Sequence, residues 1–297
     1  MIVVFGSLNV DLVAHVARLP AAGETLLASA FVASPGGKGA NQALAARRAG
    51  ARVRLFGHVG RDAFADEAVA LLRDSGVDVG GVQAIEGSTG VALVHVDAEG
   101  QNAITVASGV NANARAAQVP DSAIVHGTTL LMQLEVPLAE VRALAHRAAA
   151  RAARVVLNAS PAARLPQSLL GDISVLVVNE TEADVLARDL GDGDARTLCG
   201  RFAGTERTLV VTRGAQGVLY TSAEGVHERA APRVEAVDTV GAGDAFTGAF
   251  AAALDRGADV DRAVSEGLAA GAIACTRHGA QAAMPHHDEI RALADTL

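Results

Sequence analysis

The sequence predicts an α/β protein: a three-layer α-β-α arrangement in which helices cover both faces of a sheet, with a small β-sheet lid. Short apolar runs rich in β-branched residues, such as residues 2–5 and 155–158, alternate with helical patterns along the chain. Four other strand-like segments do not fit this alternation and indicate an inserted sheet. No linker or composition shift divides the chain, so we expect one domain over residues 1–297.

The composition limits the classes of function. Half of the 297 residues are hydrophobic, enough for one large core, and the formal net charge is −8 with no basic tract, so we expect no nucleic-acid partner. Cys199 and Cys275 are far apart, which excludes a disulfide framework and fits a reducing cytoplasm. Asn9 and Asp11 interrupt the N-terminal apolar run, and no apolar run reaches about 18 residues, so neither a secretory signal nor a membrane span is expected.

The first expected strand, residues 2–5, ends at Gly6 and is followed by Asn9 and Asp11. Polar groups just beyond the carboxyl end of a parallel strand lie where open α/β sheets bind ligands. Asn and Asp are also common in surface turns. The residues alone leave both interpretations open.

The segments at 12–16, 25–33, 90–97 and 102–107 form the expected lid, whose insertions span about residues 11–33 and 88–108. Pro20 with the Gly23-Glu24 turn joins the first two segments, and the turn signal Ala98-Glu99-Gly100-Gln101 joins the last two. Such a sheet has one apolar face to cover, and the lid of a second copy is one solution.

Residues 36–41, Gly-Gly-Lys-Gly-Ala-Asn, open an alanine-rich helix that stops at Gly50. The turn is not a Walker A loop, since Gly39 stands where that loop needs Ser or Thr. It is not a dinucleotide-binding Gly-x-Gly-x-x-Gly turn either, because its sixth position is Gln42. A lysine at a helix start, Lys38, opposes the helix dipole and so requires a partner.

The middle of the chain continues the alternation. The pattern predicts a strand from 53, a helix between Arg61-Asp62 and Ser75-Gly76, a strand start at 78, strands at 123–125, 130–134, 155–158, 175–178 and 209–212, and helices at 136–153, 244–256 and 260–276. Glu135 is a charge at the carboxyl end of an apolar run, which favours a ligand-binding role over a solvated face.

Asn179-Glu180-Thr181-Glu182 begins the next helix. Asn179 or Thr181 can cap it, with Glu182 as the acid of a capping box. A helix end of this kind can also contact a ligand, so capping and binding are compatible.

The stretch from Asp238 to Phe250 is a glycine turn followed by a helix. Gly241 and Gly243 allow close approaches that a side chain would block. The first helical turn carries unpaired N–H groups and suits an anion such as a phosphoryl group. Asp244 lies at that end; it is either an acid favoured by the helix dipole or a base directed at a hydroxyl beside an anion hole.

Two signatures identify a family. Gly-Ala-Gly-Asp followed by Ala-Phe-Thr-Gly, at residues 241–248, resembles the C-terminal signature of the ribokinase-like (PfkB) family of sugar and nucleoside kinases. Residues 36–41 resemble that family's N-terminal signature, in the form that ribokinases carry. Both signatures are in the family's order, and the resemblance extends over essentially the whole chain. It implies the ribokinase-like fold with its lid, which in many members also forms a dimer contact.

The resemblance also implies roles for individual residues. The positions that match the family's sugar site are Asn9, Asp11, Gly36, Gly37, Lys38, Asn41 and Glu135. The positions that match its nucleotide and Mg²⁺ site are Asn179, Glu182, Thr212, Gly214, Gly217 and Gly243. Asp244 matches the base that accepts the proton of the sugar hydroxyl, and the N–H groups of Gly241, Ala242 and Gly243 match the anion hole.

Ribokinases also bind an activating monovalent cation, K⁺. Resemblance places its ligands at Asp238 and at backbone carbonyls of Val240, Ala274, Arg277 and Gly279. A serine ligand of typical ribokinases falls here at Ala283, so we expect potassium activation with one ligand missing or replaced by water. The sequence His286-His287-Asp288 is interpreted as a helix start rather than a zinc site, because neighbouring residues lie on different helix faces.

The expected reaction is ATP-dependent phosphorylation of a sugar hydroxyl, with D-ribose as the first candidate and D-ribose 5-phosphate as the product. Kinases for another pentose, a ketohexose or a nucleoside are the nearest alternatives. A sugar sensor without catalysis is a further alternative, which the intact Asp244 and its glycine turn disfavour. A nicotinamide-dependent dehydrogenase is the least favoured, because the dinucleotide fingerprint fails.

Overall fold

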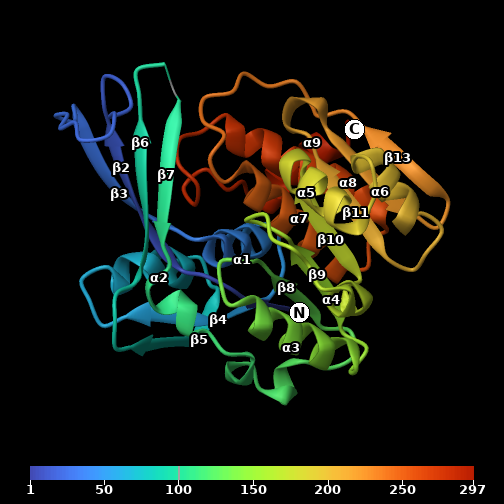
Figure 1. The fold of residues 1–297 in the computed structure, drawn as a ribbon. Coiled ribbons are helices and arrows are strands. Elements are labelled where there is room, and N and C mark those ends of the chain that lie inside the picture. The colour runs from blue at the N-terminus through green and yellow to red at the C-terminus, as the bar shows by residue number, and fades with distance from the viewer. Residues whose placement is uncertain (100) are drawn as a thin grey trace.

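The structure is a computed structural model that describes residues 1–99 and 101–297. Its largest feature is a central β-sheet (Figure 1). In spatial order its described strands are β13 (Gly225–Arg229), β12 (Val218–Ser222), β11 (Thr208–Thr212), β10 (Val175–Asn179), β9 (Arg154–Asn158), β8 (Thr129–Met132), β1 (Ile2–Phe5), β4 (Val53–Gly60) and β5 (Asp78–Ile85). All neighbours pair in parallel except β11 with β12 and β12 with β13, which are antiparallel.

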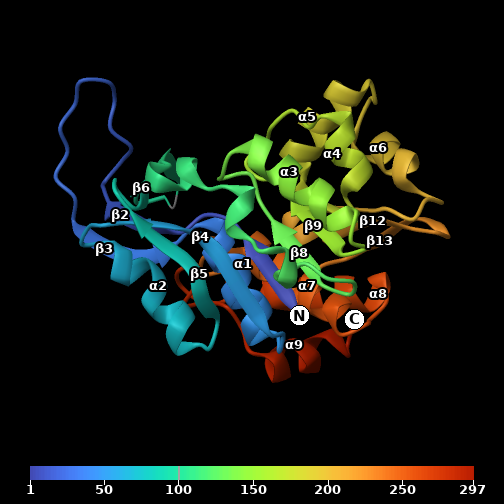
Figure 2. The same cartoon turned by 90° about the horizontal axis from the view of Figure 1, so that it is seen from below.

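Helices cover both faces of this sheet, which confirms the predicted fold class (Figure 2). One face carries α1 (Lys38–Arg48), α2 (Ala65–Asp74), α7 (Ala242–Asp255), α8 (Val260–Cys275) and α9 (His287–Ala294). The other carries α3 (Leu138–Ala149), α4 (Gln167–Asp172), α5 (Glu180–Leu190) and α6 (Ala195–Phe202). The side chains of β1 alternate between the two cores: Ile2 and Val4 face the first, Val3 and Phe5 the second. A strand buried on both sides therefore reads as an unbroken apolar run.

Strand β1 is the point where the strand order reverses. The chain leaves β1 towards β4 and β5 on one side, and later returns to β8 and continues away on the other. The helices after these turns, α1 and α3, lie on opposite faces of the sheet. Such a switch point leaves a crevice at the carboxyl ends of the strands, the usual ligand position in open α/β sheets.

A second, four-stranded sheet confirms the predicted lid. Its described strands are β3 (Ala30–Gly36), β2 (Asn9–His15), β6 (Gly90–Val96) and β7 (Asn102–Ala107). The prediction was wrong on the second of the four lid segments: the strand is Ala30–Gly36 and not 25–33, because β3 pairs residue by residue with β2 from Asn9↔Gly36 to His15↔Ala30. The turn predicted at residues 98–101 includes Gly100, which lies outside the described residues.

Two other expectations need correction, and four elements were missed. Residues 123–125 are not a strand, since the 3₁₀ turn η3 (Asp121–Ala123) stands there and Ile124 fills the core below it. The helix predicted over 136–153 is shorter, because Pro137 caps α3 and Ala152 adopts a positive φ after its end. The antiparallel edge strands β12 and β13 and the helices α4 and α6 were not predicted. The C-terminal helix start at His286 is confirmed. Within the described residues, no helix is long and apolar enough to span a membrane.

Candidate active site

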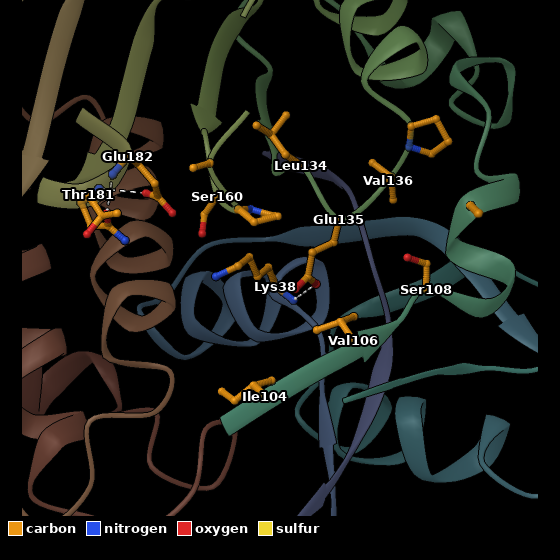
Figure 3. A pocket seen from close by; sticks show the side chains of 15 residues that line it. Lys38, Ile104, Val106, Ser108, Leu134, Glu135, Val136, Ser160, Thr181 and Glu182 are labelled. Carbon is orange, nitrogen blue, oxygen red and sulfur yellow. Dashed lines mark hydrogen bonds between the residues drawn. The ribbon is translucent and has the colours of Figure 1, made fainter. Parts of the chain in front are cut away.

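Two adjoining cavities open at the carboxyl ends of the parallel strands. The larger, about 680 Å³, lies between lid strand β7, the segment after β8 and the start of α5 (Figure 3). The smaller, about 120 Å³, reaches the start of α7. Both are lined by Lys38, Ser160, Asn179 and Glu182, so the two cavities form one continuous site.

Asp244 lies in the first turn of α7 and lines the smaller cavity with Gly241 and Gly243. Gly241 caps the helix in the left-handed conformation, with φ of 76°, and a Cβ there would meet Ala280 at 2.9 Å. The carboxylate is nearly buried, at 7% exposure, yet one side of it faces the cavity. Asp244 therefore combines an acid, a helix N-terminus and an open space, as its proposed base role requires.

Both oxygens of the Asp244 carboxylate accept a hydrogen bond from α1. Asn41 Nδ2 donates to Oδ2 at 3.0 Å, and Gln42 Nε2 donates to Oδ1 at 2.8 Å. The helices approach closely because Gly248 has no side chain: a Cβ there would lie 2.5 Å from Cβ of Ala45. The two glycine signatures, far apart in sequence, thus meet at one carboxylate.

Lys38 and Glu135 occupy the middle of the larger cavity, with Ile104 and Val106 of the lid beside them (Figure 3). The Lys38 backbone N–H donates to Glu135 Oε2 at 3.0 Å, and Ser7 Oγ donates to the same oxygen at 2.6 Å. Gly37, the cap of α1, provides no side-chain hydrogen bond, so Glu135 supplies the negative charge that this helix start favours.

The charges of four carboxylates act on the Lys38 ammonium. Burial works against its charge, but Asp244, Glu135, Glu182 and Asp11 together outweigh burial and hold the pKa of Lys38 above its ordinary value. The lysine at the helix start therefore has the partners that the sequence required. A cation held in this position suits a ligand that carries or develops negative charge.

Asn9 and Asp11 begin lid strand β2, immediately above the end of β1. Burial, followed by the charges of Glu135 and Asp244, raises the pKa of Asp11 to about 6, and Lys38 partly opposes this shift. Asn111 Nδ2 donates to Asn9 Oδ1 at 2.8 Å, which orients the Asn9 amide. Gly36 is required here, since a Cβ would lie 2.3 Å from Asp11 Oδ1.

Asn179 and Glu182 form the capping box of α5 and line both cavities. The Glu182 N–H donates to Asn179 Oδ1 at 2.8 Å, and the Asn179 N–H donates to Glu182 Oε2 at 2.9 Å. The capping interpretation is confirmed, and the same side chains face the open site. They are the chain's candidates for holding Mg²⁺ beside a bound phosphate. Within residues 1–99 and 101–297, no group of three or more His, Cys, Asp and Glu side chains could hold a metal ion by itself.

The remaining nucleotide candidates lie at the ends of β11 and the 3₁₀ turn η4 (Gly214–Gln216). Thr212 lines the smaller cavity, and its Oγ donates to the Val178 carbonyl at 3.3 Å. Gly214 begins η4. Gly217 caps the end of η4 with φ of 96°, and a Cβ there would lie 2.0 Å from the Arg229 carbonyl oxygen. The backbone packing alone therefore requires glycine at this position, whether or not it also contacts a nucleotide.

The residues matched to a monovalent-cation site also gather, behind the start of α7. Asp238 Oδ1 accepts from the Val240 N–H at 3.0 Å, and Oδ2 accepts from the Gly279 N–H at 2.9 Å. The Asp238 N–H donates to the Cys275 carbonyl, which brings Asp238 to the C-terminal end of α8, where Ala274 lies in the last turn and Arg277 follows two residues after the helix. Ala283 is fully buried. A carboxylate with loop carbonyls fits a hard monovalent cation, one hydroxyl short.

Several residues of the site were not singled out from the sequence. They are Ser7 and Asn111, which orient Glu135 and Asn9, and Gln42, Gln133 and Asn158, which form a hydrogen-bonded group with Asp244. Gln42 directly follows the first glycine signature, and Gln133 ends the strand before Glu135. Neither position shows a spacing that points to Asp244, because the contact depends on the packing of α1 against α7.

Comparisons with known proteins agree with this geometry. The description pfkB family carbohydrate kinase matches residues 1–287. Ribokinase of Schizosaccharomyces pombe is 36% identical over 300 residues, which cover 96% of this chain and 94% of the relative. The structure of ribokinase from Thermotoga maritima superposes with a TM-score of 0.91 at 31% identity, covering 99% of each chain.

Arabidopsis thaliana ribokinase complexed with ribose and ATP superposes with a TM-score of 0.86 at 28% identity, over 99% of this chain and 98% of the other. The family description, the relatives and the fold agree over nearly the full length. The chain therefore belongs to the pfkB family of carbohydrate kinases.

Proposed function

We propose that this carbohydrate kinase transfers the γ-phosphoryl group of ATP to the 5-hydroxyl of D-ribose, giving D-ribose 5-phosphate and ADP. The observation that carries the proposal is the position of Asp244: its carboxylate opens to a cavity at the N-terminus of α7, next to Lys38. The Arabidopsis thaliana ribokinase, whose structure contains ribose and ATP and superposes on this chain, supports the choice of both substrates.

The sugar lies in this proposal between the lid and the centre of the larger cavity. In this proposal Asp11 and Glu135 accept hydrogen bonds from sugar hydroxyls, and Asn9, Lys38 and Asn41 bind further sugar oxygens beside the Gly36-Gly37 turn. These side chains come from β2, α1 and the end of β8, and all converge at the switch point of the sheet. Such convergence orients one hydroxyl towards Asp244.

In the transfer, Asp244 accepts the proton of the sugar hydroxyl as its oxygen forms a bond to the γ-phosphorus. The bond from that phosphorus to the bridging oxygen of ADP breaks, and ADP leaves with the electron pair. The N–H groups of Gly241, Ala242 and Gly243 and the Lys38 ammonium stabilise the negative charge on the phosphoryl oxygens.

ATP binds in this proposal along Thr212, Gly214 and Gly217, with Gly243 at its terminal phosphate. Mg²⁺, when bound, neutralises charge on the phosphates, and Asn179 and Glu182 are the side chains that hold it, through water. K⁺, when bound beside Asp238, stabilises the loop that carries the Gly241–Gly243 amides.

The lid also supports a homodimer. Strand register places Phe31 and Leu93 on the face of the lid opposite to Ile104 and Val106, which line the cavity. Phe31 is 64% exposed and Leu93 44%. Exposed large apolar side chains on a sheet face favour pairing with a second lid.

The testing experiment measures ADP release by the purified enzyme over a panel of pentoses, ketohexoses and nucleosides. Ribose as the best acceptor, by kcat/KM, supports the proposal. If another acceptor has a higher kcat/KM, that acceptor replaces ribose as the proposed substrate, and the proposed phosphoryl transfer stays the same. Absence of ADP release with every acceptor, while sugar still binds, favours the sensor alternative.

A further inference from the structure

Three buried amide side chains form one hydrogen-bonded group with Asp244. Gln133 Nε2 donates to Gln42 Oε1 at 2.9 Å, and Gln42 Nε2 donates both to Asp244 Oδ1 at 2.8 Å and to Asn158 Oδ1 at 2.9 Å. Gln42 and Gln133 are completely buried, and Asn158 is 8% exposed. Gln42 lies in α1, Gln133 directly follows β8, and Asn158 ends β9, so the group joins three separate parts of the fold.

The hydrogen bonds of this group have one direction. Because Gln133 donates to Gln42 Oε1, the Gln42 Nε2 group must face the other way, towards Asp244 and Asn158. Asn158 is fixed in turn, since its Nδ2 donates to the Val177 carbonyl at 3.2 Å. Both hydrogens of the Gln42 amide are used. A flipped Gln42 amide would turn its single oxygen towards Asp244 Oδ1 and Asn158 Oδ1, and its NH₂ group towards the NH₂ group of Gln133.

We propose that Gln42 is a positioning residue for Asp244 and that Gln133 sets the orientation of its amide, an inference that rests on the proposed base role of Asp244. Gln42 holds Oδ1 while Asn41 holds Oδ2 at 3.0 Å. A carboxylate held at both oxygens cannot rotate without breaking a hydrogen bond, and its remaining lone pairs stay directed at the cavity. Proton acceptance then needs no rearrangement of the base.

A merely structural role for Gln42, filling a polar gap between α1 and α7, makes a different prediction. It lowers the stability of variants but leaves the turnover of folded enzyme and its pH dependence unchanged. The positioning role changes kcat and the pH profile while the sugar site, which Gln42 does not form, keeps its affinity.

The first test uses two variants and a control. Gln42→Met has a similar volume and no N–H, and its kcat falls about 10- to 100-fold with little change in sugar KM. Gln42→Glu has the same shape but brings a second carboxyl against Asp244, and the acid limb of its kcat profile moves up by about one pH unit or more. The control Thr221→Val removes another fully buried hydrogen bond, from the Leu209 N–H at 2.9 Å, away from the cavities. It lowers stability without altering kcat or the acid limb.

The second test needs no active variant. The side-chain amide NMR signals of Gln42, assigned by their loss in Gln42→Met, are compared between the wild type and Asp244→Asn. A clear shift of these signals supports the contact, and unchanged signals overturn the proposal. It is also overturned if Gln42→Glu keeps the wild-type acid limb, or if both Gln42 variants lose stability but not kcat. Failure of the wild type to phosphorylate any sugar contradicts the proposed function instead, and the NMR comparison separates the two cases.

Discussion

Asn41 donates a hydrogen bond of 3.0 Å to Asp244 across 203 residues of sequence. The bond joins the start of α1, whose glycine turn holds Lys38, to the start of α7, whose glycine turn faces the smaller cavity. The acceptor side and the donor side of the proposed phosphoryl transfer are therefore built on two helices in direct contact. Changes at this contact are expected to alter catalysis and stability together.

Asp244→Asn removes the proposed proton acceptor and keeps the shape of the side chain. We expect kcat to fall by at least about 10²- to 10⁴-fold, with sugar binding still measurable by calorimetry. Asp288→Asn is the matched control, because Asp288 is an exposed acid in the first turn of α9. Normal turnover in Asp244→Asn removes Asp244 from the role of base.

The raised pKa of Asp11 predicts a loss of sugar affinity in mild acid. With a pKa of about 6, the Asp11 carboxylate becomes protonated as pH falls through that value and no longer accepts two hydroxyl hydrogen bonds. We expect kcat/KM for the sugar to decrease below about pH 6. A profile that stays flat from pH 7 to pH 5 contradicts this assignment.

The same shift has a consequence for stability. Since the folded state binds the Asp11 proton more tightly than the unfolded state, whose pKa is near 3.8, stability is lost as pH rises from about 4 to about 6. Asp11→Asn is expected to raise the free energy of unfolding at pH 7, by on the order of 1 kcal/mol after solvent screening, while weakening sugar binding. Denaturant unfolding of the wild type and Asp11→Asn at pH 7 and pH 4 measures this difference in the free energy of unfolding, which should vanish at pH 4.

Gly248 sets the distance between α1 and α7. In Gly248→Ala the new Cβ would lie 2.5 Å from Cβ of Ala45 and 2.7 Å from the Gln42 carbonyl oxygen, so the helices must separate. We expect a loss of about 1–3 kcal/mol in stability and a lower kcat. Gly200→Ala, in the middle of α6 with no atom within 4 Å of its new Cβ, should instead stabilise by about 0.5–1 kcal/mol. Equal effects of the two substitutions in thermal melts would refute the packing argument.

Ala283 stands where typical ribokinases carry a serine ligand, so we expect this chain to bind K⁺ more weakly than they do and a serine at this position to strengthen binding. The wild type should turn over faster in K⁺ than in tetramethylammonium, and Ala283→Ser should reach half-maximal activation at a lower K⁺ concentration. The loop geometry around Asp238, Val240 and Gly279 supports this expectation. Rates that do not distinguish K⁺ from the large inert cation would exclude the site.

The outer face of the lid is expected to form the homodimer contact. Phe31→Glu with Leu93→Glu places charge on exposed apolar positions and should convert a dimer to a monomer. Analytical ultracentrifugation of the wild type and the double variant measures the mass. Glu86→Lys, a charge change at a side chain that is 92% exposed, is the control. A wild type that is monomeric at micromolar concentration contradicts the proposal.

Features that depend on neighbours in sequence were predictable. The apolar run of β1, the glycine turns before α1 and α7, the lid as an interruption of the alternation and the Asn179–Glu182 capping box all appear in the structure. Each arises from contacts or conformational preferences within a few residues, so the local pattern carries the information.

Other features depend on which elements pack together. Residues 123–125 have the composition of a strand, but Ala123 ends the 3₁₀ turn η3 and Ile124, directly after it, packs into the core. The edge strands β12 and β13 form because their residues pair in antiparallel register, β12 with the open edge of β11 and β13 with β12. Strand type at a sheet edge is a tertiary property.

The sequence by itself determined the fold class, the family and the residue types at the site, because these follow from periodicity and two local signatures. Only the tertiary structure decided that Gln42 and Asn41 hold the two oxygens of Asp244, and that the charges of four carboxylates act on Lys38. The two hydrogen bonds to Asp244 join residues 202 and 203 positions apart, and they depend on the close contact of α1 and α7 that Gly248 allows. The physical reason is that hydrogen bonds and charges act over a few ångströms of space, whatever the separation along the chain.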